Sequence, residues 1–147
     1  MVKHDDPDAL LLRFLRARKW DVHDALVMLV STMHWRSQDM HVDDEIMYKG
    51  ESGFVKASKT ALGGEKKDAE DFMAILRKGL SFIHGADKDD RPITVVRVRT
   101  HKPNEQTDRA IEQYTVYVIE TARMLLRSPV DTAVSPELTS TMTTSLR

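Results

Sequence analysis

Residues 81–98 read SFIHGADKDDRPITVVRV, and this stretch decides the fold class. Ser81–His84 is short and extended, Gly85–Asp90 is a polar turn, and Ile93–Val98 is rich in β-branched residues. This pattern predicts a strand, a turn and a second strand. The apolar start of the second strand has no polar alternation, which is typical of a strand covered on both faces. Because the rest of the chain has a helical pattern, the sequence predicts an α/β fold.

Two helices are expected at the start of the chain, because apolar residues recur there at helical spacing. The first runs over Pro7–Lys19, with Asp5 and Asp6 as candidate caps. The second opens at Asp21 and closes at Trp35 and Arg36. They form a helical hairpin with a short corner at Trp20.

The signal then weakens between residues 38 and 67. Asp43–Tyr48 predicts a short helix, while the glycines at positions 50, 53, 63 and 64 predict loops. A third helix is expected over Asp68–Lys78, ended by Gly79.

The longest predicted helix covers Thr107–Arg127. Beyond Pro129 the periodicity is lost, and residues 134–147 are expected to be a disordered tail. A buried strand followed by a helix requires a further parallel strand, which the tail does not supply convincingly. We therefore expect an incomplete sheet.

Composition excludes several classes of function. The 147 residues fit one domain, with 22 Lys and Arg against 23 Asp and Glu and a net charge of −1. This balance argues against a dedicated nucleic-acid binder, so no nucleic-acid partner is expected. The chain has no cysteine, which excludes disulfides and thiolate metal sites. No apolar run approaches the roughly 18–20 residues that span a bilayer, so any membrane contact would be peripheral.

No catalytic or metal motif is complete. A calcium loop starting at Asp87 would need glycine and glutamate where Pro92 and Val98 stand. The six histidines lack zinc-ligand spacing, and neither a phosphate loop nor a serine-hydrolase elbow is present. The sequence therefore predicts a nonenzymatic protein without cofactor.

Arg18 is the candidate binding residue. On a helical wheel it falls within the apolar stripe of Leu10, Leu11, Phe14 and Leu15. An arginine on a buried face needs an anion or carbonyl partners. It could hold a phosphate bidentately, or it could bond the terminal carbonyls of its helix or extend to water.

Arg18 also belongs to the most basic cluster of the chain, with Arg13, Arg16 and Lys19. This cluster could dock on an anionic surface. The alternative is a solvated helix face paired with Asp21, Asp24 and other acidic residues.

Several segments are similar to a known family. LLRFLRARKWD (11–21), WR (35–36) and GADKDDRPI (85–93) resemble the CRAL-TRIO family, and VYVIETA (116–122) resembles fungal, yeast-type phosphatidylinositol transfer proteins. The resemblance implies a helical N-terminal region (5–80), the N-terminal part of a lipid-binding α/β domain (81–133) and the tail (134–147). It also implies truncation at both ends, so that only part of the pocket would be encoded.

The implied function is phospholipid binding, with phosphatidylinositol as the ligand, and transfer between membranes by a cytoplasmic, transiently membrane-associated protein. Arg18 matches an arginine that helps to bind the headgroup in this family. Ile83 and Thr94 match pocket-lining positions that carry tyrosines in members able to hold phosphatidylcholine. Asp90 replaces a usual glycine, in a turn conformation that Asp tolerates. The alternatives are a nonenzymatic interaction fragment and a helical module that binds anionic membrane surfaces through the basic cluster.

Overall fold

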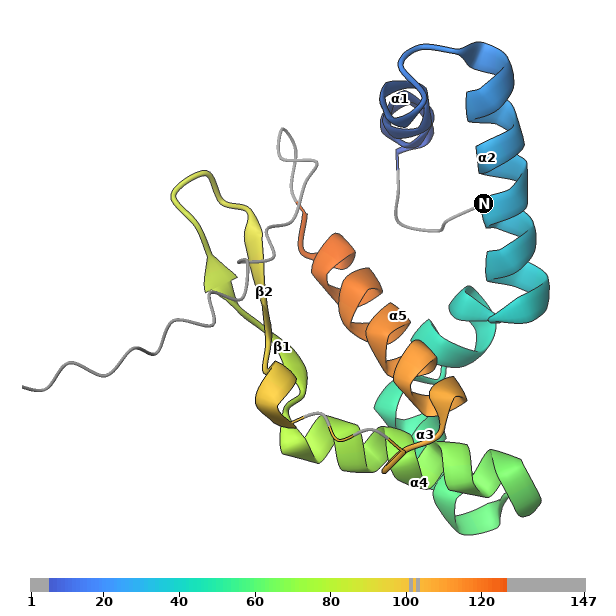
Figure 1. The fold of residues 1–147 in the computed structure, drawn as a ribbon, viewed down its shortest axis with the longest axis vertical. Coiled ribbons are helices and arrows are strands. Elements are labelled where there is room, and N and C mark those ends of the chain that lie inside the picture. Colours follow the sequence, from blue (N-terminus) through green and yellow to red (C-terminus); the bar gives the residue numbers. More distant parts are fainter. Residues whose placement is uncertain (1–5, 101, 103, 127–147) are drawn as a thin grey trace, which may run out of the picture.

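The computed structural model describes residues 6–100, 102 and 104–126. Figure 1 shows a helical hairpin, a second pair of helices, a β-hairpin and a long helix that lies between the β-hairpin and α2. In chain order the elements are α1 (Pro7–Ala17), α2 (Val22–His34), two π-helical segments (Trp35–Asp39 and Val42–Met47), α3 (Gly50–Thr60), α4 (Gly63–Lys78), β1 (Ser81–Ala86), β2 (Pro92–Val96), a 3-10 turn (Val98–Thr100) and α5 (Asp108–Met124). The combination of helices with a sheet confirms the predicted α/β class, and the described strands form one two-stranded sheet.

The predicted α1–α2 hairpin is present because both helices have side-chain caps. Asp6 accepts a hydrogen bond from the backbone N–H of Ala9, and Asp21 accepts one from that of Asp24, each at 2.9 Å. The carboxylates satisfy amides that a helix start leaves unpaired, and they lie at the positive end of the helix dipole. The hairpin nevertheless buries little of itself: Ala25 is the buried residue of the two helices.

The corner of this hairpin is a Schellman motif. The Lys19 N–H donates to the Arg16 carbonyl at 3.2 Å, and the Trp20 N–H donates to the Leu15 carbonyl at 2.8 Å. Lys19 and Trp20 have φ angles of +52° and +69°. The left-handed region costs a residue with a Cβ about 1–2 kcal/mol. The predicted corner at Trp20 is therefore confirmed, and its backbone is strained.

Residues 50–67 correct the sequence prediction, because helices replace the expected loops. Gly50–Thr60 is α3, and α4 begins at Gly63 instead of Asp68. The aromatic residue Phe54 accounts for the difference: its ring stacks on that of Phe72 in α4, with centroids 3.6 Å apart. Burying an aromatic pair outweighs the penalty of about 1 kcal/mol for a glycine within a helix.

The predicted strand–turn–strand is present as an antiparallel hairpin in which Ile83 lies opposite Thr94. Asp90 adopts the expected left-handed turn conformation, with φ +59°. Beyond its buried first residue, Pro92, β2 is half-buried. Helix α5 contacts both strands of the hairpin, and among the described residues no other helix packs extensively on them. The expectation that β2 is covered on both faces was therefore wrong for the described part of the chain.

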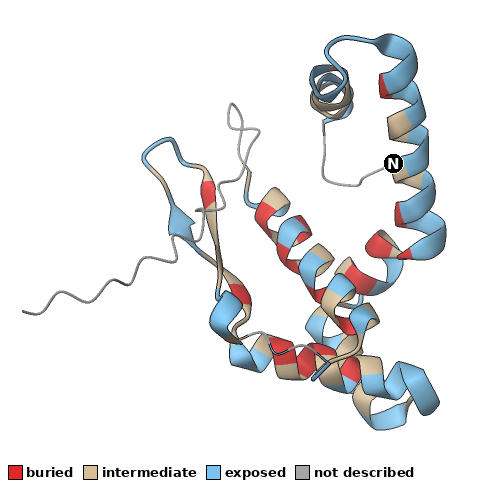
Figure 2. Ribbon diagram, in the orientation of Figure 1, coloured by how far each residue is buried: buried red, intermediate tan, exposed pale blue. Residues whose placement is uncertain are grey.

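Helix α5 is buried on two sides. On one side Tyr114 joins Phe72 of α4 in the main core, and on the other Val116 packs against a second cluster that includes Ile46. Figure 2 shows buried residues along α4 and α5 and few on α1 and α2. The core therefore lies around α5, and the α1–α2 hairpin stands at its edge.

The ends of α5 differ in how far they match the prediction. Thr107 caps the helix by accepting a hydrogen bond from the Ala110 N–H at 3.2 Å. The helix ends at Met124. The predicted end at Arg127, the missing strand after position 133 and the disordered tail over 134–147 all lie outside the described residues.

Candidate functional site

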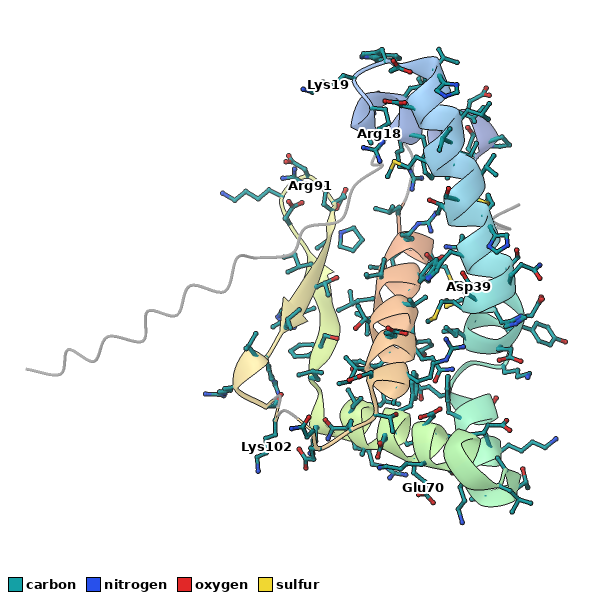
Figure 3. The ribbon with its side chains drawn as sticks, turned by 45° about the vertical axis from the view of Figure 1, so that its right-hand side comes forward. Arg18, Lys19, Asp39, Glu70, Arg91 and Lys102 are labelled. Atoms are coloured by element: carbon teal, nitrogen blue, oxygen red, sulfur yellow. The ribbon has the colours of Figure 1, made fainter. Side chains whose placement is uncertain are left out.

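Arg18 forms the C-cap of α1, and its backbone N–H donates to the carbonyls of Phe14 and Leu15 at 3.1 and 3.2 Å. On the helical wheel Arg18 falls within the apolar stripe, but the residue is exposed, which fits the alternative that its side chain extends to water. The apolar stripe is not a buried face, because no residue of α1 is fully covered. Figure 3 shows Arg18 beside Lys19 at the α1–α2 corner.

An open groove of about 750 Å³ begins at Arg18 and follows α2. Its other lining residues are Asp24, Val27, Met28, Ser31, Thr32 and Trp35. A guanidinium beside apolar and hydroxyl groups suits an anion attached to an apolar body, because arginine binds phosphate through paired, charge-assisted hydrogen bonds. Asp24 is the carboxylate in this lining, and it limits the positive charge of the groove.

A smaller recess of about 270 Å³ lies between α1, α2 and the end of α5. Its lining is mainly apolar and includes three arginines: Leu10, Arg13, Phe14, Ala17, Met28, Thr32, Met33, Arg36 and Arg123. Met28 and Thr32 line both concavities, so the recess adjoins the Arg18 groove. Its volume lies just below the range of about 300–1,000 Å³ that is usual for ligand pockets. It can take a headgroup or a short length of acyl chain, and not a whole phospholipid.

The floor of the recess is tied to α5 by a buried ion pair. Arg36, whose side chain is 6% exposed, donates from Nη1 and Nη2 to the two carboxylate oxygens of Glu120, at 2.8 and 3.1 Å. Arg36 Nη2 also donates to Asp43 at 3.0 Å, and Arg123 donates to Glu120 at 2.6 Å. The bidentate geometry fixes the position of Arg36, and the shared carboxylate of Glu120 also holds Arg123.

The same network sets the charge states of its members. Burial alone would raise the pKa of Glu120, but the hydrogen bond from Arg36 and the charges of Arg123 and Arg36 outweigh it and lower that pKa. Burial would likewise lower the pKa of Arg36, and the hydrogen bond and charge of Glu120, with those of Asp43, raise it instead. Arg36 and Glu120 are therefore both ionised at neutral pH.

Ile83 and Thr94 lie together but away from Arg18. They are cross-strand partners in the β-hairpin, and both are half-buried. Neither lines the Arg18 groove or the recess. Helix α5 separates the β-hairpin from α2 (Figure 1). The predicted site residues therefore fall into two places, the α1–α2 corner and the β-hairpin.

The described residues contain no group of three or more His, Asp or Glu side chains placed to hold a metal ion. Within the same residues no helix has the length and apolar character to cross a bilayer.

The sequence reasoning missed the ion-pair network around Glu120. A signal for it was available, because Glu120 interrupts the apolar run of residues 116–119 and stands three residues before Arg123. The helical pattern of Thr107–Arg127 could not show that Arg36, which lies 84 positions away in a π-helical segment, pairs with Glu120.

Two segments of the chain match known domains. Residues 1–31 match the CRAL/TRIO N-terminal domain, and residues 76–135 match the CRAL/TRIO domain. This chain belongs to the CRAL-TRIO family. Within this CRAL-TRIO chain, Arg18 lies in the first matched segment and Glu120 in the second, and Arg36 links the region between them to the second.

Fungal CRAL-TRIO proteins are similar over most of the chain. A CRAL-TRIO domain-containing protein of Schizosaccharomyces pombe is 45% identical over 132 residues, which is 90% of this chain and 27% of the relative. Phosphatidylinositol transfer protein CSR1 of Eremothecium gossypii is 38% identical over 133 residues, covering 90% of this chain and 28% of that protein. A second S. pombe CRAL-TRIO domain-containing protein is 33% identical over 135 residues, covering 88% of this chain and 32% of its own length. The chain thus spans about a quarter to a third of these relatives.

Proposed function

We propose that this chain binds a phospholipid, phosphatidylinositol, and takes part in its transfer between membranes without catalysing a reaction. One observation carries the proposal: Arg18 lines an open groove that adjoins a mainly apolar recess whose lining includes arginines. The 38% identity to a protein named as a phosphatidylinositol transfer protein supports the choice of lipid.

The small size of the recess supports a role for these residues at the headgroup end of the lipid. Each acyl methylene removed from water gains about 0.8 kcal/mol, so a carrier must enclose both chains in a dry cavity. The 270 Å³ recess does not enclose them. In this proposal Arg18 would hold the phosphate.

The same lipid exchange would keep the protein in the cytoplasm, with transient contact at membrane surfaces.

Lipid copurification tests the proposal. Native mass spectrometry of the purified chain should show phosphatidylinositol bound in preference to phosphatidylcholine. Arg18→Ala should weaken phosphatidylinositol binding by roughly 10- to 100-fold, the usual value of a lost charge-assisted hydrogen bond.

Arg77→Ala is the matched control, because Arg77 is an exposed arginine in the last turn of α4 and lines neither concavity. It should bind lipid as the wild type does. Absence of phospholipid from the wild type, or equal losses from the two variants, would reject the proposed site.

A further inference from the structure

The α1–α2 corner carries large exposed apolar side chains among cations. Trp20 is 61% exposed and Val22 is 71% exposed. Arg16, Arg18 and Lys19 precede them directly in the chain and are also exposed. We name these five residues the corner patch. In Figure 3 the labelled Arg18 and Lys19 lie at the end of the molecule away from α4.

Trp20 is exposed at a corner whose backbone is left-handed at two successive residues. The left-handed conformations of Lys19 and Trp20 each carry a steric cost that glycine would avoid. Two successive residues adopt this costly conformation, and the Trp20 indole is nevertheless exposed. Packing in the core therefore does not explain why a tryptophan stands at this position. Strained segments of this kind are often associated with function.

The charge of the corner is positive although the whole chain has a net charge of −1. Residues 16–21 contain three cations and one carboxylate, that of Asp21. The Asp21 carboxylate accepts the Asp24 N–H as the cap of α2. Lys19 and its neighbours thus present their charge beside an exposed indole.

We propose that the corner patch docks the protein on an anionic bilayer, with the Trp20 ring at the level of the lipid headgroups. Tryptophan is enriched at membrane–water interfaces because its body is apolar and its N–H is polar. Flanking lysines and arginines add attraction to anionic lipids. This inference deepens the proposed function by naming the residues that meet the membrane from which lipid is exchanged.

The charge pattern favours a lipid surface over a second copy of the chain as the occupant. Two copies would bring the same cations of Arg16, Arg18 and Lys19 together around Trp20, and like charges in contact repel. An anionic bilayer attracts all of them at once and leaves the indole in its preferred environment.

Tryptophan fluorescence with vesicles tests the proposal. Trp35→Phe leaves Trp20 as the single indole of the chain. On vesicles of phosphatidylcholine and phosphatidylserine with brominated acyl chains, its emission should shift to the blue and be quenched. Pure phosphatidylcholine vesicles should give a much smaller change, and added salt should reverse the effect.

Sedimentation with the same vesicles gives the matched comparison. Trp20→Ala should weaken vesicle binding roughly tenfold, as expected for a large side chain that loses its apolar contact. Lys19→Gln should weaken it roughly fivefold. Tyr48→Ala removes another exposed aromatic side chain, one that is 83% exposed, and should change nothing. Circular dichroism checks that each variant is folded, and Trp20→Phe provides a second, milder variant.

Unchanged Trp20 emission on anionic vesicles would overturn the proposal, as would equal vesicle binding by wild type and Trp20→Ala. A blue shift without vesicles that grows with protein concentration would also overturn it and assign the patch to a second copy. These vesicles contain no phosphatidylinositol. Failure here therefore leaves the headgroup site standing, and failure to capture phosphatidylinositol leaves the docking site standing.

Discussion

The α1–α2 hairpin and the α4–α5 pair are both helical, but they bury very different shares of their residues. In α1 no residue is buried, and in α2 the buried residue is Ala25. Helices α4 and α5 contribute Phe72, Tyr114 and most of the main core. Because buried apolar area supplies most of the folding free energy, stability resides in α4 and α5. The exposed hairpin is left to carry the groove, the recess and the corner patch.

A buried ion pair helps to join the two regions. Arg36 extends from the segment after α2 to Glu120 on α5, and Arg123 shares the same carboxylate. A buried ion pair costs desolvation and is often no more stabilising than an apolar replacement. It fixes one geometry of hairpin and core, however, and that geometry shapes the recess.

The largest expected effect is in the core. Phe72→Ala should lower the free energy of unfolding by about 3–5 kcal/mol, because it removes a ring that stacks on Phe54 and leaves a cavity. Phe14→Ala, on half-buried α1, should cost about 1 kcal/mol or less. Urea unfolding of both variants measures the contrast, and equal losses would contradict it.

The second-largest effect is expected at the ion pair of Arg36 and Glu120, which links the two regions. Glu120→Gln should cost about 3 kcal/mol, because it leaves the buried Arg36 guanidinium without its main charge partner. The double variant Arg36→Met with Glu120→Leu should recover much of that loss. Urea unfolding measures the difference. If the double variant is less stable than Glu120→Gln, the ion pair itself supplies net stability.

The ion pair also gives a pH dependence of known sign. The folded-state pKa of Glu120 is lowered, so its stabilisation is fully present above the unfolded value of about 4.3 and disappears as the pH falls through the folded value. The difference in unfolding free energy between wild type and Glu120→Gln should therefore shrink on acidification from about pH 6 to about pH 3. A constant difference across that range would contradict the assignment.

A smaller effect is expected at the start of α2. Asp21→Ala removes the cap to the Asp24 amide and should cost about 1 kcal/mol. Hydrogen exchange should show faster opening in the first turn of α2, with α4 and α5 unchanged. Faster exchange in α5 would mean that hairpin and core unfold as one unit.

The smallest expected effect is a gain in stability at the α1–α2 corner. Lys19→Gly relieves a left-handed residue and should stabilise the fold by about 0.5 kcal/mol, after allowing for the greater freedom of glycine in the unfolded chain. Thermal unfolding should show a slightly higher Tm while vesicle binding falls. A lower Tm would show that the Lys19 side chain makes a stabilising contact.

Local sequence signals predicted local structure well. Asp6 and Asp21 mark the helix starts, and Gly79 ends α4 in a left-handed conformation. The Asp90 turn between the strands was also correct. Each of these features depends on neighbouring residues only, so its cause is visible in the sequence.

Features that depend on distant contacts were missed. The glycines of α3 predicted a loop, because the stacking of Phe54 on Phe72, which stabilises the helix, is not visible in the local sequence. The exposure of Arg18 and the burial of Glu120 depend on which elements cover each helix. The wheel and the resemblance selected Arg18 as a candidate, and the structure adds the groove that this residue lines. Its binding role stays a prediction.

Hydrogen exchange of the whole chain, with and without vesicles that contain phosphatidylinositol, tests the central claim most directly. We predict that lipid slows exchange of amides in residues 10–36, which include Arg18 and line the groove and recess, and leaves those of α4 unchanged. Slowing confined to α4, or none in residues 10–36, would contradict the claim that the exposed hairpin holds the lipid headgroup.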